Sequence, residues 1–150
     1  MGIKFKGTNE LKVTLRRLPA QMLDASAVGQ HNAAQDVMAV SVQRAPYEEG
    51  DLEKSAYVSD IRYGGQSASV DYGYYGPEYL VRQHEDLSYQ HPGQDSRTAN
   101  PGRAAQGQAK FLESAQNEMM NQTTRTIAEA VDYFLRTGRM PSTRGTIPNK

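Results

Sequence analysis

The feature that most constrains the fold is a Gly64–Gly65 pair between two short segments in which apolar and polar residues alternate. That alternation, over residues 55–63 and 67–75, is typical of half-buried β-strands, and a glycine pair suits a two-residue hairpin turn. Such a loop places both apolar rows on one face, pairing Tyr63 with Gln66, Ile61 with Ala68 and Tyr57 with Tyr72. A three-residue loop would set the apolar residues against Ser67, Ser69 and Asp71. The sequence therefore predicts an antiparallel hairpin with a two-residue loop.

A long helix is predicted over residues 8–45, before the hairpin. Its apolar residues recur at steps of four and three, as one face of a helix requires; they include Leu11, Leu15, Leu18, Met22 and Ala25. Pro46 stops the helix, because its ring pushes the preceding residue out of helical geometry. Within the segment, Pro19 either kinks the helix or opens a second one, and Gly29 is a weak point.

A second long helix is predicted after the hairpin, over residues 108–136, with Gly138 as its C-cap. Its apolar stripe consists of Phe111, Ala115, Met119, Ile127, Ala130 and Phe134. Together these elements predict an α+β fold, in which a small antiparallel β-sheet is packed by a long N-terminal helix and a long C-terminal helix.

The chain is expected to form one domain, residues 1–137, because 150 residues suffice for a single core. A long loop over residues 88–107 is rich in Gly, Pro, Gln and Asn, and residues 138–150 read as an extended basic arm. The arm and the loop region 94–106 have too little apolar content to offset the entropy of fixing their backbones. We expect both to lack a partner within the chain and to order only against a neighbour.

Composition narrows the function classes. Lysine plus arginine equals aspartate plus glutamate, 17 each, which disfavours a dedicated nucleic-acid binder. The chain has no cysteine, which removes disulfides and thiolate metal sites, and no segment resembles a signal peptide or a membrane span. Only 37% of the residues are hydrophobic and none is tryptophan, so some apolar surface is expected to be buried against partners.

One cluster could carry chemistry: His84 and Glu85 with His91. A helical zinc-protease motif needs its second histidine where Ser88 stands, so the spacing fails. We therefore expect no catalytic residue, no cofactor and no metal. Two alternatives remain: a metal-dependent hydrolase, if these three side chains converge on an ion, and a small DNA-binding protein. A DNA-binding protein would require five arginines to lie on one face of the fold: Arg16, Arg17, Arg97, Arg103 and Arg139.

In order, the segments resemble the head-to-tail joining family of tailed bacteriophages, also called neck, minor tail or tail-completion proteins. The likeness spans residues 1 to about 136. A long helix runs into Ala45-Pro46 and then Gly50-x-Leu52-x-x-Ser55 before a strand. A tyrosine-rich strand end leads to Tyr79-x-x-x-Gln83-His84-Glu85, followed by His91-Pro92-Gly93. The run Gln108-Ala109-Lys110-Phe111-Leu112-Glu113 then opens the last helix. Residues 94–106 depart from the family pattern and look like an insertion.

The resemblance implies a non-enzymatic virion protein, assembled in the bacterial cytoplasm, that forms a homo-oligomeric ring in the phage neck. Such a ring, six-fold if it matches the tail, would join an adjacent neck or stopper protein to the tail tube protein. Double-stranded DNA would pass through its lumen without specific binding. The tail-completion and tail-terminator tiers both stay open.

Rings use heterologous contacts, so two different patches are expected on each subunit. Tyrosine is enriched at interfaces, and four tyrosines fall within residues 72–79. One predicted patch is the segment from Tyr74 to Glu85, and the other is the opening of the last helix. The predicted interface residues are Tyr74, Tyr75, Tyr79, Arg82, Gln83, His84, Glu85, Lys110 and Glu113.

Overall fold

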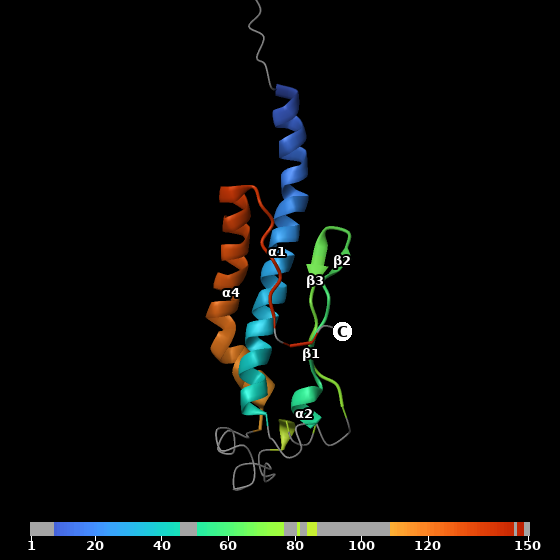
Figure 1. The fold of residues 1–150 in the computed structure, drawn as a ribbon, viewed down its shortest axis with the longest axis vertical. Helices are drawn as coiled ribbons and strands as arrows, with labels where there is room; N and C mark the ends of the chain where they lie inside the picture. The colour runs from blue at the N-terminus through green and yellow to red at the C-terminus, as the bar shows by residue number, and fades with distance from the viewer. Residues whose placement is uncertain are drawn as a thin grey trace, which may run out of the picture.

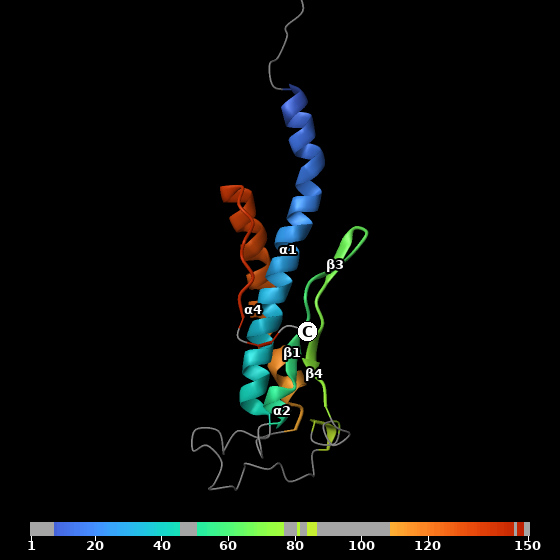
Figure 2. The same cartoon turned by 45° about the vertical axis from the view of Figure 1, so that its right-hand side comes forward.

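The protein has an α+β fold in which two long helices pack side by side and four short strands lie against one of them (Figure 1). The structure is a computed structural model that describes residues 8–45, 51–76, 81, 84–86, 109–145 and 147–148, with side chains from residue 16 onward. Helix α1 spans Thr8–Arg44 and helix α4 spans Phe111–Thr137; a short helix, α2, covers Asp51–Lys54. Helix α4 runs antiparallel to α1; its later turns lie on the side of α1 away from the strands, while its first turns lie beside β4 (Figures 1 and 2).

Helix α1 is a single element, so the alternative of a second helix opening at Pro19 is wrong. Pro19 is exposed, and a proline there removes one backbone hydrogen bond without disturbing a packed face. The buried part of α1 begins at Ala25 and consists mainly of small side chains. Beyond it, the N-terminal part of the helix projects past the end of α4 (Figure 1). We call residues 8–21 the projecting half of α1.

Gly29 is the point of closest approach between the two helices rather than a bend. A Cβ atom added to Gly29 would lie 2.8 Å from the Cα atom of Ile127 and 3.0 Å from the Cβ atom of Ala130. Real Cβ atoms do not approach a backbone atom so closely, so glycine lets the two backbones come together. The residue that looked like a weak point therefore fixes the packing of α1 on α4.

Two short antiparallel sheets replace the one continuous hairpin that was predicted. Strand β1 (Ala56–Val58) pairs with β4 (Tyr72–Tyr74), and β2 (Arg62–Gly64) pairs with β3 (Ser67–Ser69). Tyr63 stands opposite Ala68 rather than Gln66, so the predicted register is wrong by two residues at the loop. The loop still has two residues, but they are Gly65 and Gln66. Gly65 has the positive φ, 63°, that the turn requires, and Gly64 belongs to the strand.

A β-bulge separates the two sheets. The amide of Ser59 donates to the carbonyl of Asp71 (2.7 Å), whereas Arg62 stands opposite Ser69. Two residues, 60 and 61, therefore face the single residue 70. The hydroxyl of Ser59 accepts a hydrogen bond from the amide of Asp71 (2.9 Å), which satisfies a donor at the interruption. Bulges bend a strand, and the β2–β3 hairpin leans away from α1 in Figure 2.

The core-facing row of β1 differs from the predicted row. Ala56 and Val58 are buried against α1, while Tyr57 lies on the opposite face and approaches the ring of Tyr75 (centroids 6.0 Å apart). Tyr57 is opposite Gly73 rather than Tyr72. The second strand segment, residues 67–75, has alternate apolar residues on the core side: Val70, Tyr72 and Tyr74 pack against the core.

The last helix matches its prediction closely. Four residues of the predicted stripe are buried: Phe111, Ala115, Ala130 and Phe134. Gly138 is the C-cap, with φ 67° and its amide donating to the carbonyl of Phe134 (2.8 Å). The helix begins at Phe111, and Lys110 before it has a left-handed conformation, φ 55°.

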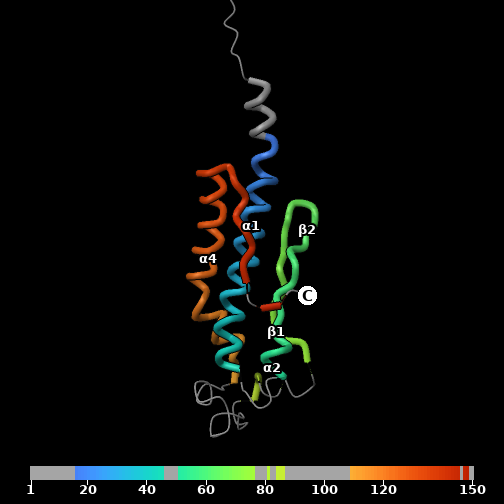
Figure 3. Tube along the Cα trace, in the orientation of Figure 1, coloured from blue at the N-terminus to red at the C-terminus, as the bar shows by residue number. Residues whose placement is uncertain are grey.

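The C-terminal arm has partners within the chain, so the expectation that it lacks them is wrong. From Gly138 the chain turns back and follows α1 toward β1 (Figure 3). Side chains of Asn32 and Gln35 on α1 hydrogen-bond to the arm, and the amide of Val58 donates to the carbonyl of Pro148 (3.1 Å). The arm thereby covers the free edge of β1. The predicted loop over residues 88–107 lies outside the described residues.

Candidate interaction site at the start of helix α4

Segments far apart in the sequence meet around one side chain, that of Phe111. This ring is fully buried at the first position of α4. We call the residues around it the Phe111 cluster; they are Ala45, Leu52, Tyr74, His84, Phe111 and Leu112. They come from the end of α1, from α2, from β4, from the segment that follows β4 and from the beginning of α4.

Local sequence places each member. Ala45 directly follows α1, and its amide still donates to the carbonyl of Ser41 (2.9 Å). Leu52 is the one buried residue of α2, and the hydroxyl of Ser55 donates to its carbonyl (2.7 Å) and closes the turn. The left-handed conformation of Lys110 aims the chain into α4, while its amide donates to the carbonyl of His84 (2.7 Å). Non-glycine residues adopt this conformation only at some cost, so the surrounding contacts hold it in place.

Tyr74 belongs largely to this interior. Its ring meets that of Phe111 edge to face, with centroids 5.2 Å apart, and its hydroxyl shares a 2.8 Å hydrogen bond with Ser41. Burial, and to a lesser degree the charge of Glu53, raises the pKa of Tyr74 well above its usual value, against the opposing effect of the Ser41 bond. Most of the Tyr74 side chain therefore makes contacts inside the subunit, and its place at an interface stays a prediction.

A row of charged and polar side chains lies over the cluster. The His84 Nδ1 atom is 2.7 Å from a carboxylate oxygen of Glu85, whose other oxygen pairs with Lys110; Lys110 also pairs with Glu113 at 3.2 Å. The Lys110 ammonium, and then His84, lower the pKa of Glu85, while Glu85 and Glu113 raise the pKa of Lys110. These pairs are solvent-exposed, so they orient the side chains more than they stabilise the fold. Glu85 and Lys110, expected on two different patches, pair within one chain.

Beside the cluster, a surface hollow of about 280 Å³ opens between β4, the 81–85 segment and the start of α4. Its lining includes Tyr57, Tyr72 and Val81, and the last of these is 63% exposed. The adjacent Tyr75 is 46% exposed. Among the described residues, the Nε2 atom of His84 is buried without a hydrogen-bond partner. The exposed apolar side chains at the rim of the hollow suit a contact surface.

The structure brings together six of the nine predicted interface residues: Tyr74, Tyr75, His84, Glu85, Lys110 and Glu113. The other three, Tyr79, Arg82 and Gln83, lie outside the described residues, as does His91 of the hypothetical metal site. Within the described part of the chain, no three His, Cys, Asp or Glu side chains gather where they could hold a metal ion. Of the arginines proposed for DNA binding, Arg97 and Arg103 are likewise undescribed.

Sequence reasoning missed two polar residues that matter structurally, Asn32 and Gln35. Both are buried, and they lie three residues apart from each other on α1, with the small apolar residues Ala33 and Ala34 between them. Uncharged amides inside an apolar stretch need hydrogen-bond partners from elsewhere in the chain, and this was the signal that could have revealed the docked arm.

No helix in the part of the chain that the structure describes has the length and apolar character needed to cross a membrane. No protein-family model, curated protein or solved structure matches the chain.

Proposed function

We propose that the chain is a structural subunit of the neck of a tailed bacteriophage. In this role it forms a homo-oligomeric ring that joins the head-closure proteins to the tail tube, as a tail-completion or tail-terminator protein. The basis is the resemblance of its motif order to that family, and one property of the fold supports it.

That property is the convergence of the motif segments on the Phe111 cluster. Ala45 and Leu52 come from the helix stop and the turn after it, His84 and Glu85 from the Gln-His-Glu run, and Phe111 from the run that opens α4. Ala45 and Phe111, in the first and the last of these runs, are far apart in the sequence. Short runs that meet at one site support a family resemblance better than the same runs scattered over a surface. Residues in contact must fit one another, so a change in one run restricts the residues that the others can have.

The shape also suits a subunit that must reach its neighbours. The projecting half of α1 extends past the rest of the molecule, and its exposed residues include Arg16, Arg17 and Gln21. The β2 strand is exposed along its length. A ring subunit needs such edges and extensions for heterologous contacts. An overall net charge of zero fits a lumen through which DNA moves without being held.

The decisive experiment removes the protein from the phage that would encode it. We expect filled heads and separate tails to accumulate, and supply of the protein in trans to restore joined particles, as counted by electron microscopy. Gold-labelled antibody against the chain should mark the head–tail junction. The proposal is wrong if the label lies on the capsid shell or at the tail tip. It is also wrong if joined particles form in the absence of the protein.

A further inference from the structure

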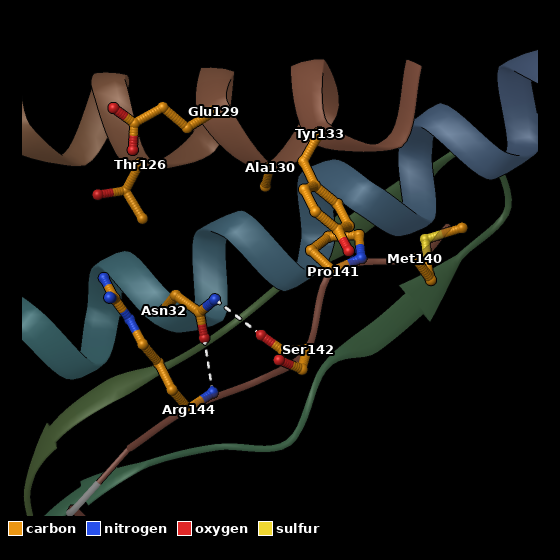
Figure 4. Close-up of a pocket in the computed structure, with 9 residues that line it drawn as sticks. All are labelled: Asn32, Thr126, Glu129, Ala130, Tyr133, Met140, Pro141, Ser142 and Arg144. Atoms are coloured by element: carbon orange, nitrogen blue, oxygen red, sulfur yellow. Dashed lines mark hydrogen bonds between the residues drawn. The ribbon is translucent and has the colours of Figure 1, made fainter. Parts of the chain in front are cut away.

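The C-terminal arm is held to α1 by two side-chain amides, each of which makes a two-point contact. The Nδ2 atom of Asn32 donates to the carbonyl of Ser142 (3.1 Å), and its Oδ1 atom accepts from the amide of Arg144 (2.8 Å) (Figure 4). The Nε2 atom of Gln35 donates to the carbonyl of Ile147 (3.0 Å), and its Oε1 atom accepts from the amide of the same residue (3.0 Å). We call the α1 surface that carries these amides the arm groove.

Nearly all of these contacts reach the backbone of the arm. Val58 adds another, from its amide to the carbonyl of Pro148 (3.1 Å). Two arm side chains also take part: Arg144 pairs with Asp36 at the surface (2.8 Å), and Ile147 packs on the main core. Backbone contacts of this kind are the same whichever copy of the chain supplies the arm.

The arm groove needs an occupant. With the arm docked, Asn32 is 9% exposed and Gln35 is 4% exposed, and the hydrogen bonds of both amides described above are to the arm. A buried amide without a partner carries the full penalty of desolvation. The arm can therefore leave its own groove at little cost only if an equivalent arm replaces it.

The hinge between α4 and the arm is poorly packed on its own subunit. After Gly138, residues Arg139 and Met140 are exposed. The next residues stand away from α4 and leave a cavity of about 600 Å³ between helix and arm (Figure 4). Its walls include Ala130 and Tyr133 of α4 and Pro141 of the arm. The hydrogen-bonded end of the arm is thus joined to α4 by a short connecting segment that packs little against the rest of the subunit.

We propose that neighbouring subunits in the ring exchange their arms, so that each arm fills the arm groove of the next copy. This proposal rests on the proposed ring. The structure shows the arm docked in the groove of its own chain. In a ring the next groove is held close, which raises its effective concentration. Nine extended residues, 139–147, reach about 30 Å, and a closed ring leaves no groove empty.

Arm exchange can be tested by cross-linking introduced cysteines. The chain has no cysteine of its own, so every cross-link must join introduced thiols. Asp36 and Arg144 are suitable sites, because their pairing is exposed and contributes little to docking. Purified protein carrying both Asp36→Cys and Arg144→Cys is treated with a short bismaleimide reagent at concentrations where sedimentation shows oligomers. Exchange predicts a ladder of covalent multimers that ends at the ring number. Without exchange, every cross-link closes within one chain and the ladder is absent.

Two single variants, Asp36→Cys and Arg144→Cys, are then mixed before assembly. Exchange predicts a covalent dimer that contains one copy of each, and no such dimer when Asn117→Cys, on the exposed face of α4, replaces Asp36→Cys. Oligomers without the mixed dimer would overturn arm exchange and leave the ring intact. A protein that sediments as a monomer at every concentration would overturn exchange and the ring together.

Discussion

Gly29 shows how much of the helix pairing depends on one missing side chain. Alanine favours a helix over glycine by about 1 kcal/mol at an ordinary position. Here the added methyl group would collide with the backbone of Ile127 and with Ala130. The steric cost of overpacking, about 1–3 kcal/mol, should exceed the gain in helix propensity.

We therefore expect Gly29→Ala to lower the free energy of unfolding by up to about 2 kcal/mol, and Gly29→Val to lower it further. Chemical denaturation followed by circular dichroism measures both. Ala20→Val, at an exposed position of the same helix, is the control and should change stability by only a few tenths of a kcal/mol. A stabilised Gly29→Ala protein would show that the helices are farther apart than described.

The Tyr74 hydroxyl makes stability depend on alkaline pH. Burial raises the pKa of Tyr74 above the ordinary value of 10.0, so the folded state keeps this proton where the unfolded state releases it. Its contribution is fully present below about pH 10 and declines as the pH rises above that value, by up to about 1.4 kcal/mol per pH unit.

Tyr74→Phe should flatten this alkaline decline relative to the natural protein, with unfolding measured between pH 8 and about pH 11. It should also reduce stability at neutral pH by about 1–3 kcal/mol, because the buried hydroxyl of Ser41 loses its partner. Tyr75→Phe, at the neighbouring exposed ring, serves as the control. Equal alkaline slopes for the natural protein and Tyr74→Phe would contradict the assignment.

The exposed rim of the hollow offers a test of the contact surface. Tyr75→Ala combined with Val81→Ala should leave the circular dichroism spectrum and melting temperature of the subunit close to those of the natural protein. Joined particles should fall about tenfold or more, the effect of losing about 1.4 kcal/mol at an interface hot spot. Leu135→Ala, at an exposed position of α4, is the matched control. Unchanged particle numbers would place the contact elsewhere.

At the scale of elements, the long helices were predictable because their signals are redundant. Helix α4 has a repeated apolar stripe and a glycine at its end, and each indicates the same boundary. The hairpin register was not predictable, because two adjacent glycines offer two positions for one left-handed residue. A one-residue bulge then changed the pairing again before β1 and β4. The alternation of apolar and polar residues cannot reveal a bulge. The extra residue moves the side chains that follow it to the opposite face of the strand, so one pattern no longer describes the whole strand.

The candidate site was predictable in part. The order of the motifs indicated which segments carry it, but not that Glu85 and Lys110 would pair within one subunit. The arm was misjudged for a related reason. Its low apolar content predicts a lack of partners, yet side-chain amides of α1 hydrogen-bond to its backbone, and amino-acid composition carries no information about backbone contacts.

Removal of residues 139–150 should lower the free energy of unfolding by several kcal/mol, since each amide left without partners costs about 1–3 kcal/mol. Asn32→Ala should cost less in the truncated chain than in the full chain, because its hydrogen-bond partners are already gone. This non-additivity, measured in a double-mutant cycle by denaturation, is the specific signature of the amide contacts. Strictly additive losses would mean that the arm acts through some other contact.

At the scale of the whole molecule, the two long helices differ in length by ten residues, 37 against 27. With a rise of 1.5 Å per residue, α1 is longer by about 15 Å. The surplus lies at the N-terminal end of α1, where residues 19–21 are exposed. Folding of the body gains little from this projection.

Deletion of residues 1–17 should therefore change the free energy of unfolding by no more than about 0.5 kcal/mol, as expected for exposed positions. Particle joining in the phage should nevertheless fail. A variant with Arg16→Gln and Arg17→Gln keeps the helix at full length and separates the role of charge from that of reach. If the deleted protein unfolds, the projection belongs to the core; if it still joins particles, the projection is not a contact element.

The docked arm also determines when helix α1 can form all of its hydrogen bonds during translation. Asn32 and Gln35 lie 110 and 112 positions before residues to which their amides bind. At bacterial synthesis rates of about 5–20 residues per second, the ribosome needs roughly 5–20 seconds to make the intervening chain. During that interval α1 already exists without the backbone that its amides require. The arm, which is made long after α1, is therefore the segment that completes the hydrogen bonding of the first helix.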